Sequence, residues 1–446
     1  MNYFHSVRLI DSRCKGCTHC IRTCPTEAIR VRNGKAIIIS ERCIDCGACI
    51  RTCPNSAIIA VTDPLEAIHR YQYKIAIPAP ALVSQFSRRY SVEKVLAGFL
   101  LLGFDRVLEV GLGADLIKRA TSDYLKSAGS LLPRPVISSE CPAVVRLIQV
   151  RYPGLAGNIL PIQAPMALTG RYAKELTVRE LGIPSSDIGV FFISPCPAKA
   201  TAAKQPVGTP NSYVDGVIAI SDMMNYIKAN FERIRPPDTP IQAASGSGLG
   251  WGRRGGVIAG LDIPNLLAVD GIQEVSRVLE KIENGGFQNI QFMEAMACVC
   301  GCVGGVLTSE NPFIAMLKLD IVAREIGQGS REAFETARRF IPKEWYDLPL
   351  KIEPRPAISL GSDVREAMKR MQEIELLCKE LPDIDCGACG CPTCRAFAED
   401  VAAGHMTRMD CLFDLRERVR SLAGELFSLA KKLPQVMRDK GGSRDT

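Results

Sequence analysis

The sequence predicts an α/β protein whose central part has largely parallel sheets, with a small cysteine-rich α+β region before it and a small, mostly helical cysteine-rich region after it. Three observations support this prediction. Short apolar runs alternate with helical patterns between residues 73 and 296. Cysteines are absent from residues 54–140 but crowd near both ends of the chain. Five further cysteines lie in the central part, three of them within five residues.

Composition narrows the class of protein. The 446 residues are 47% hydrophobic and 23% charged, which is ordinary for a globular chain of two or three domains. Arg and Lys are scattered despite a net charge of +7, so nucleic acid is not an expected partner. The longest apolar run, VLAGFLLLGF, is too short to span a membrane, and the start has no secretion signal. Clustered thiols indicate metal ligands in a reducing compartment, and therefore a cytoplasmic protein.

Residues 12–62 contain an internal repeat with a period of 29 residues. Each copy carries Cys-x2-Cys-x2-Cys-x3-Cys-Pro, the run that binds two 4Fe-4S clusters in bacterial ferredoxins, where the fourth cysteine of each run serves the other cluster. Zinc is a weaker alternative, because both overlapping runs end in Cys-Pro. The predicted ligands are Cys14, Cys17, Cys20 and Cys53 for one cluster, and Cys43, Cys46, Cys49 and Cys24 for the other.

The central part begins with a predicted linker helix at residues 62–72. Ser91 is the expected N-cap of a helix that ends near Gly103. Predicted strands lie at residues 74–77, 106–110, 134–138, 187–194, 216–220 and 289–295, and further predicted helices at 111–125, 221–231 and 311–326. This alternation favours parallel strands connected by helices.

A glycine-rich stretch, SGSGLGWGRRGG, runs from Ser245 to Gly256. It lacks the Gly-Lys-Ser/Thr ending of a P-loop, and no clear strand precedes it. We interpret it as a loop whose backbone can approach a bulky cofactor closely, with nucleotide binding as the less favoured alternative.

The central cysteines follow apolar, β-prone runs. Cys141 follows RPVIS, Cys196 follows GVFFIS, and the stretch QFMEAMACVCGCVGGV carries the remaining three. Loops that leave the carboxyl ends of parallel strands converge on one crevice, so four thiolates could surround one inorganic cluster. The alternative is that Cys141 and Cys196 are ordinary buried cysteines.

The C-terminal region has its own cysteine pattern. Cys386-x2-Cys389-x4-Cys394, with Cys411 after a gap of 16 residues, predicts a third accessory 4Fe-4S cluster. Cys391 is a spare thiol there, and Cys378 a structural thiol on the preceding helix. Residues 415–433 predict an amphipathic helix for core packing or a homodimer contact, with partner docking as the alternative. Residues 440–446 are expected to be disordered.

The central motifs resemble the catalytic domain of FeFe hydrogenases. SSECP, SPCPAKATA and EAMACVCGCVGG are similar to that family's Thr-Ser-Cys-Cys-Pro, Met-Pro-Cys-x2-Lys-x2-Glu and Glu-x-Met-Ala-Cys-x3-Cys signatures. The likeness covers residues 1 to about 330, and the domain order looks like the divergent, sensory branches of the family. It implies a ferredoxin-like domain at 1–62, an H-cluster domain at 63–370, a 4Fe-4S domain at 371–415 and a helix with a tail at 416–446.

The resemblance also implies residue roles. Cys141, Cys196, Cys298 and Cys302 would hold the 4Fe-4S part of the H-cluster, and Cys302 would bridge to a two-iron subsite. The CO, CN and azadithiolate ligands of that subsite are made by separate maturases. Lys199 matches the lysine that hydrogen-bonds a cyanide, and Met296 the methionine packed on the two irons. Ala79, Pro80 and Ala81 look like the wall of the pocket. Cys300 is left over.

Departures from the family concern the proton path. Glu140 stands where the family has the proton-passing thiol, Val144 replaces its tryptophan, and Ala202 replaces a glutamate. The stretch LIKRATSDY replaces further glutamates. Burial beside an anionic cluster raises the pKa of a carboxyl group, so Glu140 is a candidate proton carrier. The alternatives are that Glu140 only caps its loop, or that Cys300 carries the proton.

Three functions follow from this resemblance. The first is slow, reversible H2 oxidation, with H2, protons and ferredoxin or another electron carrier as partners. The second is an H2 or redox sensor with the same cofactor and a signalling partner. The third is an iron-sulfur assembly factor without the two-iron site, against which Lys199 and Met296 speak, since a scaffold has no use for a cyanide donor.

Overall fold

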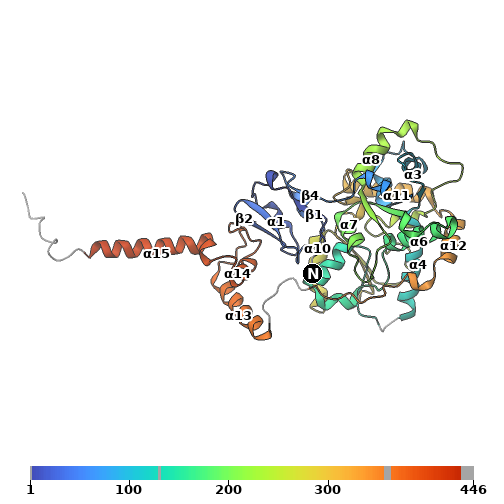
Figure 1. Ribbon diagram of the computed structural model, residues 1–446. Helices are drawn as coiled ribbons and strands as arrows, with labels where there is room; N and C mark the ends of the chain where they lie inside the picture. The colour runs from blue at the N-terminus through green and yellow to red at the C-terminus, as the bar shows by residue number, and fades with distance from the viewer. Residues whose placement is uncertain (1–2, 129–131, 356–362, 433–446) are drawn as a thin grey trace, which may run out of the picture. The chain divides into compact units, whose positions relative to one another are not determined.

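The computed structural model describes residues 3–128, 132–355 and 363–432 (Figure 1). The chain divides into two compact units. The first comprises Met1–Lys15, Thr23–Ala28 and Ile38–Ala357, and the second comprises Gly16–Arg22, Ile29–Ile37 and Ile358–Thr446. The stretch predicted to be disordered, 440–446, lies outside the described residues. Within the described part, no helix has the length and apolar character needed to cross a membrane.

The first unit is built on two parallel sheets. One has the strand order β6 (Arg106–Val107), β5 (Tyr73–Pro78), β8 (Ile188–Ser194) and β9 (Gly216–Ala219). All seven residues of β8 are buried, as expected for a strand covered on both faces. The other sheet has the order β10 (Leu266–Asp270), β11 (Phe292–Met296) and β7 (Val136–Ile137). The prediction of a largely parallel α/β fold is confirmed.

Most helices of the first unit connect these strands, and the last two follow β11. They are α3 (Val92–Leu101), α4 (Val110–Ala128), α5 (Pro142–Arg151), α6 (Pro165–Leu181), α7 (Pro197–Lys204), α8 (Ile220–Ala229), α9 (Gly246–Gly250), α10 (Ile272–Glu283), α11 (Pro312–Ile326) and α12 (Arg331–Phe340). Ser91 caps α3 as predicted, since its side chain accepts a hydrogen bond from Lys94 N. The predicted linker helix is a short 3₁₀ turn, η2 (Leu65–Arg70), because Pro64 precedes it and Tyr71 returns to extended backbone.

The repeat contributes to both units. In the first unit, β1 (Val7–Leu9) pairs antiparallel with β4 (Ile58–Ala60), next to α2 (Ala48–Thr52). The second unit contains β2 (Ile29–Arg32), which pairs with β3 (Lys35–Ile38), and α1 (His19–Thr23). It also contains α13 (Val364–Glu380), α14 (Cys394–Ala402) and α15 (Leu412–Lys431), and Ile374, Leu381 and Phe397 belong to a core built around α13 and α14.

Candidate metal centres

Four central cysteines come from loops at the carboxyl ends of three strands. Cys141 follows β7 and Cys196 follows β8; each is the N-cap of a helix that starts with proline, α5 and α7 respectively. Cys298 and Cys302 lie in the loop after β11. Burial raises the pKa of Cys298, and the charges of Cys196, Cys141 and Cys302 raise it further. The four thiols are therefore close enough to act on one another.

Lys199, in the first turn of α7, lies among these thiols. Burial acts to lower the pKa of its ammonium group, but the charges of Cys302, Cys196 and Cys141 outweigh burial and raise the pKa. Its Nζ donates to the backbone oxygen of Glu140 at 3.1 Å. In turn, burial raises the pKa of Cys302 to about 12, while Lys199 acts to lower it. Lys199 thus offsets part of the negative charge that four thiolates would carry.

Glu140 is buried next to Cys141, with 6% of its surface exposed. Its Oε1 has no hydrogen-bond partner among the described residues. Burial raises the pKa of this carboxyl group to about 7, and the charge of Glu294 acts in the same direction. A buried carboxyl group with an open oxygen, beside a cluster of thiols, can hold a proton.

The predicted pocket wall is buried where the glycine-rich segment packs. Ala79, Pro80 and Ala81 are buried after β5, and Met296 is buried at the end of β11. A Cβ atom on Gly252 would lie 3.2 Å from Ala81 N and 3.3 Å from the Pro80 Cβ atom. Val303 N donates to Gly252 O at 3.0 Å. The glycines therefore let the backbone approach other protein backbone, and part of the segment forms the short helix α9.

Cys300 has different neighbours from the four thiols. Its backbone adopts a φ of 63°, and its N donates to Asp270 Oδ2 at 2.6 Å. Burial raises the pKa of its thiol, with Asp270 acting in the same direction and Arg254 against it. Its role in proton transfer stays a prediction.

The sequence did not predict that buried carboxylates hold the glycine-rich segment. Glu294 is fully buried on β11, and its carboxylate accepts from the backbone N of Gly255, Val257 and Ile258 at 2.7, 3.0 and 3.1 Å. Burial raises its pKa to about 7. The available signal was an acid within the apolar run QFMEAM.

Three other carboxylates bind the five consecutive backbone N–H groups before α9. Glu93 accepts from residues 241 and 242, Glu109 from 243 and 244, and Asp115 from 245. The pKa of Glu109 rises to about 7 through burial, against its two backbone hydrogen bonds. These residues gave no local sequence signal, because their partners are 130 to 149 positions away.

Cysteines of the repeat form a second group in the first unit. Burial raises the pKa of Cys43 and Cys46; the charge of Cys24 acts on both, and that of Cys49 on Cys46. The structure thus brings together the predicted ligands of one ferredoxin-type cluster. Cys24 Sγ accepts from Ala28 N, and Cys53 Sγ from Ala57 N, both at 3.2 Å, as expected of a repeat. The grouping of Cys14, Cys17, Cys20 and Cys53 stays a prediction.

A direct contact joins α2 to the central cysteine loop. Arg51 donates to the backbone oxygen of Gly304, and its charge acts to lower the pKa of Cys298. Gly47 precedes α2 with a φ of 78°, and a Cβ atom there would lie 2.7 Å from Val306 Cγ2. The group of Cys24, Cys43, Cys46 and Cys49 therefore lies next to the central thiols.

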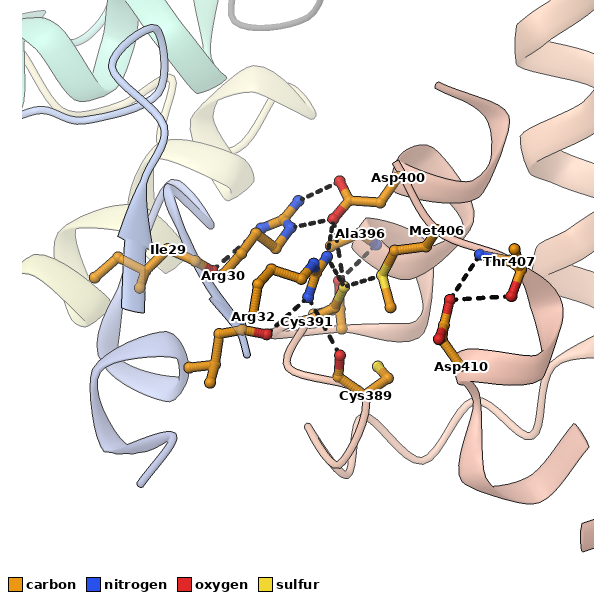
Figure 2. Close-up of polar contacts among 12 residues, drawn as sticks. Ile29, Arg30, Arg32, Cys389, Cys391, Ala396, Asp400, Met406, Thr407 and Asp410 are labelled. Carbon is orange, nitrogen blue, oxygen red and sulfur yellow. Dashed lines mark hydrogen bonds and ion pairs between the residues drawn. The ribbon is translucent and has the colours of Figure 1, made fainter. Parts of the chain in front are cut away.

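The C-terminal cysteine loop is held by two arginines of β2, as Figure 2 shows. Arg30 Nε lies 2.8 Å from Asp400 Oδ2, and Arg32 forms an ion pair with the same carboxylate. Arg32 also donates to Cys389 O at 3.2 Å and to Cys391 Sγ at 3.3 Å. A Cβ atom on Gly390 would lie 2.1 Å from the backbone oxygen of Val31, so the loop and β2 are in contact.

The spare thiol, Cys391, has a structural place in this network. It is buried, and its Sγ lies 3.5 Å from Asp400 Oδ2 and 3.6 Å from Met406 Sδ. Its hydrogen bond is the largest influence that lowers the pKa of Cys389 to about 6. Cys394 N donates to Asp385 Oδ1 at 2.6 Å. Burial raises the pKa of Cys378, and the charge of the nearby Cys394 acts in the same direction. The shared cluster of Cys386, Cys389, Cys394 and Cys411 stays a prediction.

The family comparison agrees with the central geometry. Residues 72–262 and 258–306, together more than half of the chain, match the family described as the C-terminal domain of the iron-only hydrogenase large subunit. The chain belongs to this family. Residues 6–54 also match a 4Fe-4S dicluster domain, and residues 381–413 match an Fe-S cluster family.

Individual relatives are distant. Iron hydrogenase 1 of Clostridium pasteurianum is 24% identical over 48% of this chain and 44% of its own length, so the chain spans less than half of that relative. The periplasmic [Fe] hydrogenase large subunit of Nitratidesulfovibrio vulgaris is 25% identical over 68% of this chain and 86% of its own. The cytosolic Fe-S cluster assembly factor nar1 of Aspergillus fumigatus is 23% identical over 38% and 33%.

Solved structures support the fold. An FeFe hydrogenase variant from Chlamydomonas reinhardtii aligns with a TM-score of 0.51 and 18% identity, covering 66% of this chain and 95% of that chain. The likeness confirms the FeFe-hydrogenase-like arrangement of the α/β region.

Proposed function

We propose that this chain interconverts H2 with protons and electrons, slowly, at an H-cluster held by Cys141, Cys196, Cys298 and Cys302. The observation that supports this most strongly is the convergence of four thiols from three strand ends around the half-buried Lys199. The donor set fits a 4Fe-4S cluster, which takes four thiolates. When bound, the H-cluster would supply the redox chemistry of H2 cleavage and formation.

Residues of the chain prepare the pocket for that group. Lys199 offers a charged donor suited to a cyanide ligand, since it is held among the thiols by their charge and by its bond to Glu140 O. Met296 and the 79–81 wall supply apolar surface that keeps water out. Retention of Lys199 and Met296 favours a loaded two-iron subsite.

Glu140 is the proposed proton carrier, on the basis of its position. It is buried next to a predicted ligand, and its Oε1 is open among the described residues. Glu140→Gln keeps the size and polarity of the side chain but removes the exchangeable acid. We expect at least tenfold slower H2 turnover with an unchanged infrared spectrum; unchanged turnover would remove Glu140 from the relay.

Three accessory 4Fe-4S clusters are proposed to conduct electrons to or from the pocket. In the first unit, the Arg51–Gly304 contact places one ferredoxin-type group next to the central loop. In the second unit, Arg22 Nη2 donates to Cys386 O at 3.1 Å, so the segment with Cys17 and Cys20 touches the C-terminal cysteine loop. Ferredoxin or another carrier is the proposed electron partner, and separate maturases would supply the two-iron subsite, in a cytoplasmic setting. The division into regions 1–62, 63–370, 371–415 and 416–446 is part of this proposal.

Infrared spectroscopy of the matured protein tests this function. The expected result is a set of CO and CN bands, which no accessory cluster produces. Lys199→Ala should shift or remove the CN bands. Lys204→Ala, on the same helix but 39% exposed and near Asp63, is the matched control and should leave them unchanged. A wild-type protein that has been treated with the maturases and carries its accessory iron-sulfur clusters, but lacks these bands, would contradict the proposal.

The nar1 relatives make an assembly factor the alternative that such a negative result would favour. A sensor with the same cofactor would show the bands but little turnover. An H2-uptake assay with an artificial electron acceptor therefore separates the enzyme from the sensor once the bands have been seen.

A further inference from the structure

Helix α15 carries an apolar stripe that no described part of its own chain covers. It is 20 residues long, and none of its residues is buried. Six large apolar side chains follow one another at spacings of three and four residues: Leu412, Leu415, Val419, Leu422, Leu426 and Leu429. All six are exposed, by 42% to 67%.

This spacing is the a/d repeat of a coiled coil. Apolar residues every 3.5 positions on average form a seam that packs into the seam of a second helix. Exposure of such a seam to water is unfavourable, at roughly 25 cal/mol per Å² of apolar surface. A helix with the same repeat is the occupant that fits the seam best.

Charges beside the seam select the occupant and its direction. With Leu412 at position a, the g positions beside the seam are Arg418 and Glu425, and the e positions are Arg416, Ala423 and Ala430. In a parallel pair, g faces the e position of the next heptad on the other helix, so Arg418 and Glu425 would both face alanine. In an antiparallel pair, g faces g, so Arg418 of each copy meets Glu425 of the other.

The apolar layers are complete in that antiparallel arrangement. Leu412 meets Leu429 of the second copy, Leu415 meets Leu426, and Val419 meets Leu422. Each layer then combines one a residue with one d residue, and the two-fold axis makes both copies equivalent. Within one helix, Arg418 and Glu425 are seven positions apart, too far for the ion pairs that form at three or four. No ion pair of either residue occurs within the described part of the chain.

We propose that α15 forms a two-fold, antiparallel coiled coil with α15 of a second copy of this chain. The proposal is independent of the chemistry at the central thiols. Because the helix is about 30 Å long, the two C-terminal cysteine loops would lie at opposite ends of the coiled coil. Electrons would then not pass between the copies through these loops.

Size-exclusion chromatography with light scattering on the full, iron-loaded chain tests the pairing. Wild type should be a dimer that dissociates on dilution, and Leu422→Lys should be a monomer. Ser428→Lys adds the same charge on the opposite face, and should remain a dimer. Iron content and visible absorbance should be equal in all three, which excludes misfolding. A monomeric wild type, a dimeric Leu422→Lys or a larger assembly would overturn the proposal.

Charge exchange tests the direction. Arg418→Glu and Glu425→Arg should each weaken self-association about tenfold, since each puts like charges opposite one another twice per dimer. The two variants mixed should form a heterodimer about as tight as wild type. Equal association of single and mixed samples would overturn the antiparallel arrangement.

Discussion

The central thiols and the C-terminal cysteine loop are held in position in two different ways. The proposed central ligands follow three strand ends, at residues 137, 194 and 296, and the fold of the whole first unit positions them. The proposed C-terminal ligands come from one stretch, which two arginines of β2 hold through Asp400. The backbone near the central site is bound by buried carboxylates, whereas the C-terminal loop is bound by the guanidinium groups of the buried Arg30 and the half-buried Arg32. The central site therefore depends on global folding, and the C-terminal site depends on a single ion-pair network.

Loss of one central ligand should have the largest effect. Cys298→Ala removes one thiol from the group of four, and the described residues that act on this thiol include no other donor that could replace it. We expect complete loss of CO and CN infrared bands and of H2 turnover. Electron paramagnetic resonance should still detect the accessory clusters.

Cys300→Ala is the matched control, two positions along the same loop. Its thiol is influenced by Asp270 and Arg254, and it should keep the bands. The opposite pattern, with bands lost in Cys300→Ala and kept in Cys298→Ala, would contradict the ligand assignment.

Loss of a C-terminal ligand should be confined to its own loop. Cys389→Ala should lower the iron content by about four atoms per chain, one 4Fe-4S cluster, and leave the CO and CN bands in place. Cys391→Ala should keep that iron, because this thiol is occupied with Arg32 and Asp400. Equal iron loss in both variants would show that the spare thiol is itself a ligand.

The next prediction concerns the ion-pair network of Asp400 with Arg30 and Arg32. Asp400→Ala leaves Arg30, whose side chain is only 4% exposed, without its carboxylate. Removing one partner of a buried pair costs about 3–5 kcal/mol. Unfolding of the second unit in guanidinium chloride, monitored through the loss of iron-sulfur absorbance, should show this loss of stability. Glu380→Ala, from a pair exposed by 44% and 54%, should cost less than about 1 kcal/mol.

The buried carboxylates predict a pH dependence of the first unit. Burial raises the pKa of Glu109 to about 7 in the folded chain, from 4.5 as its ordinary value. The folded state therefore binds a proton more tightly than the unfolded state. Its contribution to stability is full below pH 4.5 and is lost as the pH rises from there through 7, by about 3 kcal/mol.

Glu109→Gln should reduce this dependence between about pH 4.5 and 8, because glutamine stays neutral and can still accept from Ala243 and Ala244. Thermal unfolding of the wild type and the variant across that range measures the difference. Glu274→Gln changes a glutamate that is 59% exposed, and its profile should follow the wild type. A parallel slope in Glu109→Gln would rule out Glu109 as the cause.

What could be predicted from the sequence was local. The buried strand at 187–194, the Ser91 cap and the cysteine repeat each have a signal within a few residues. β10 was missed because its residues are all half-buried and show no alternation. The carboxylate partners were also missed, since Glu109 and Ala243 are 134 positions apart and Arg30 and Asp400 are 370 apart. Only folding reveals such pairs, and they determine how the loops are held.

The bond from Arg51 to Gly304 has a consequence for the speed of electron transfer. Tunnelling slows exponentially as donor and acceptor separate, so a flexible joint between α2 and the central loop would make the rate fluctuate. The hydrogen bond from this guanidinium group to a main-chain oxygen links α2 to the central loop within one compact unit. Current into or out of the pocket would then be governed by driving force, and not by domain motion.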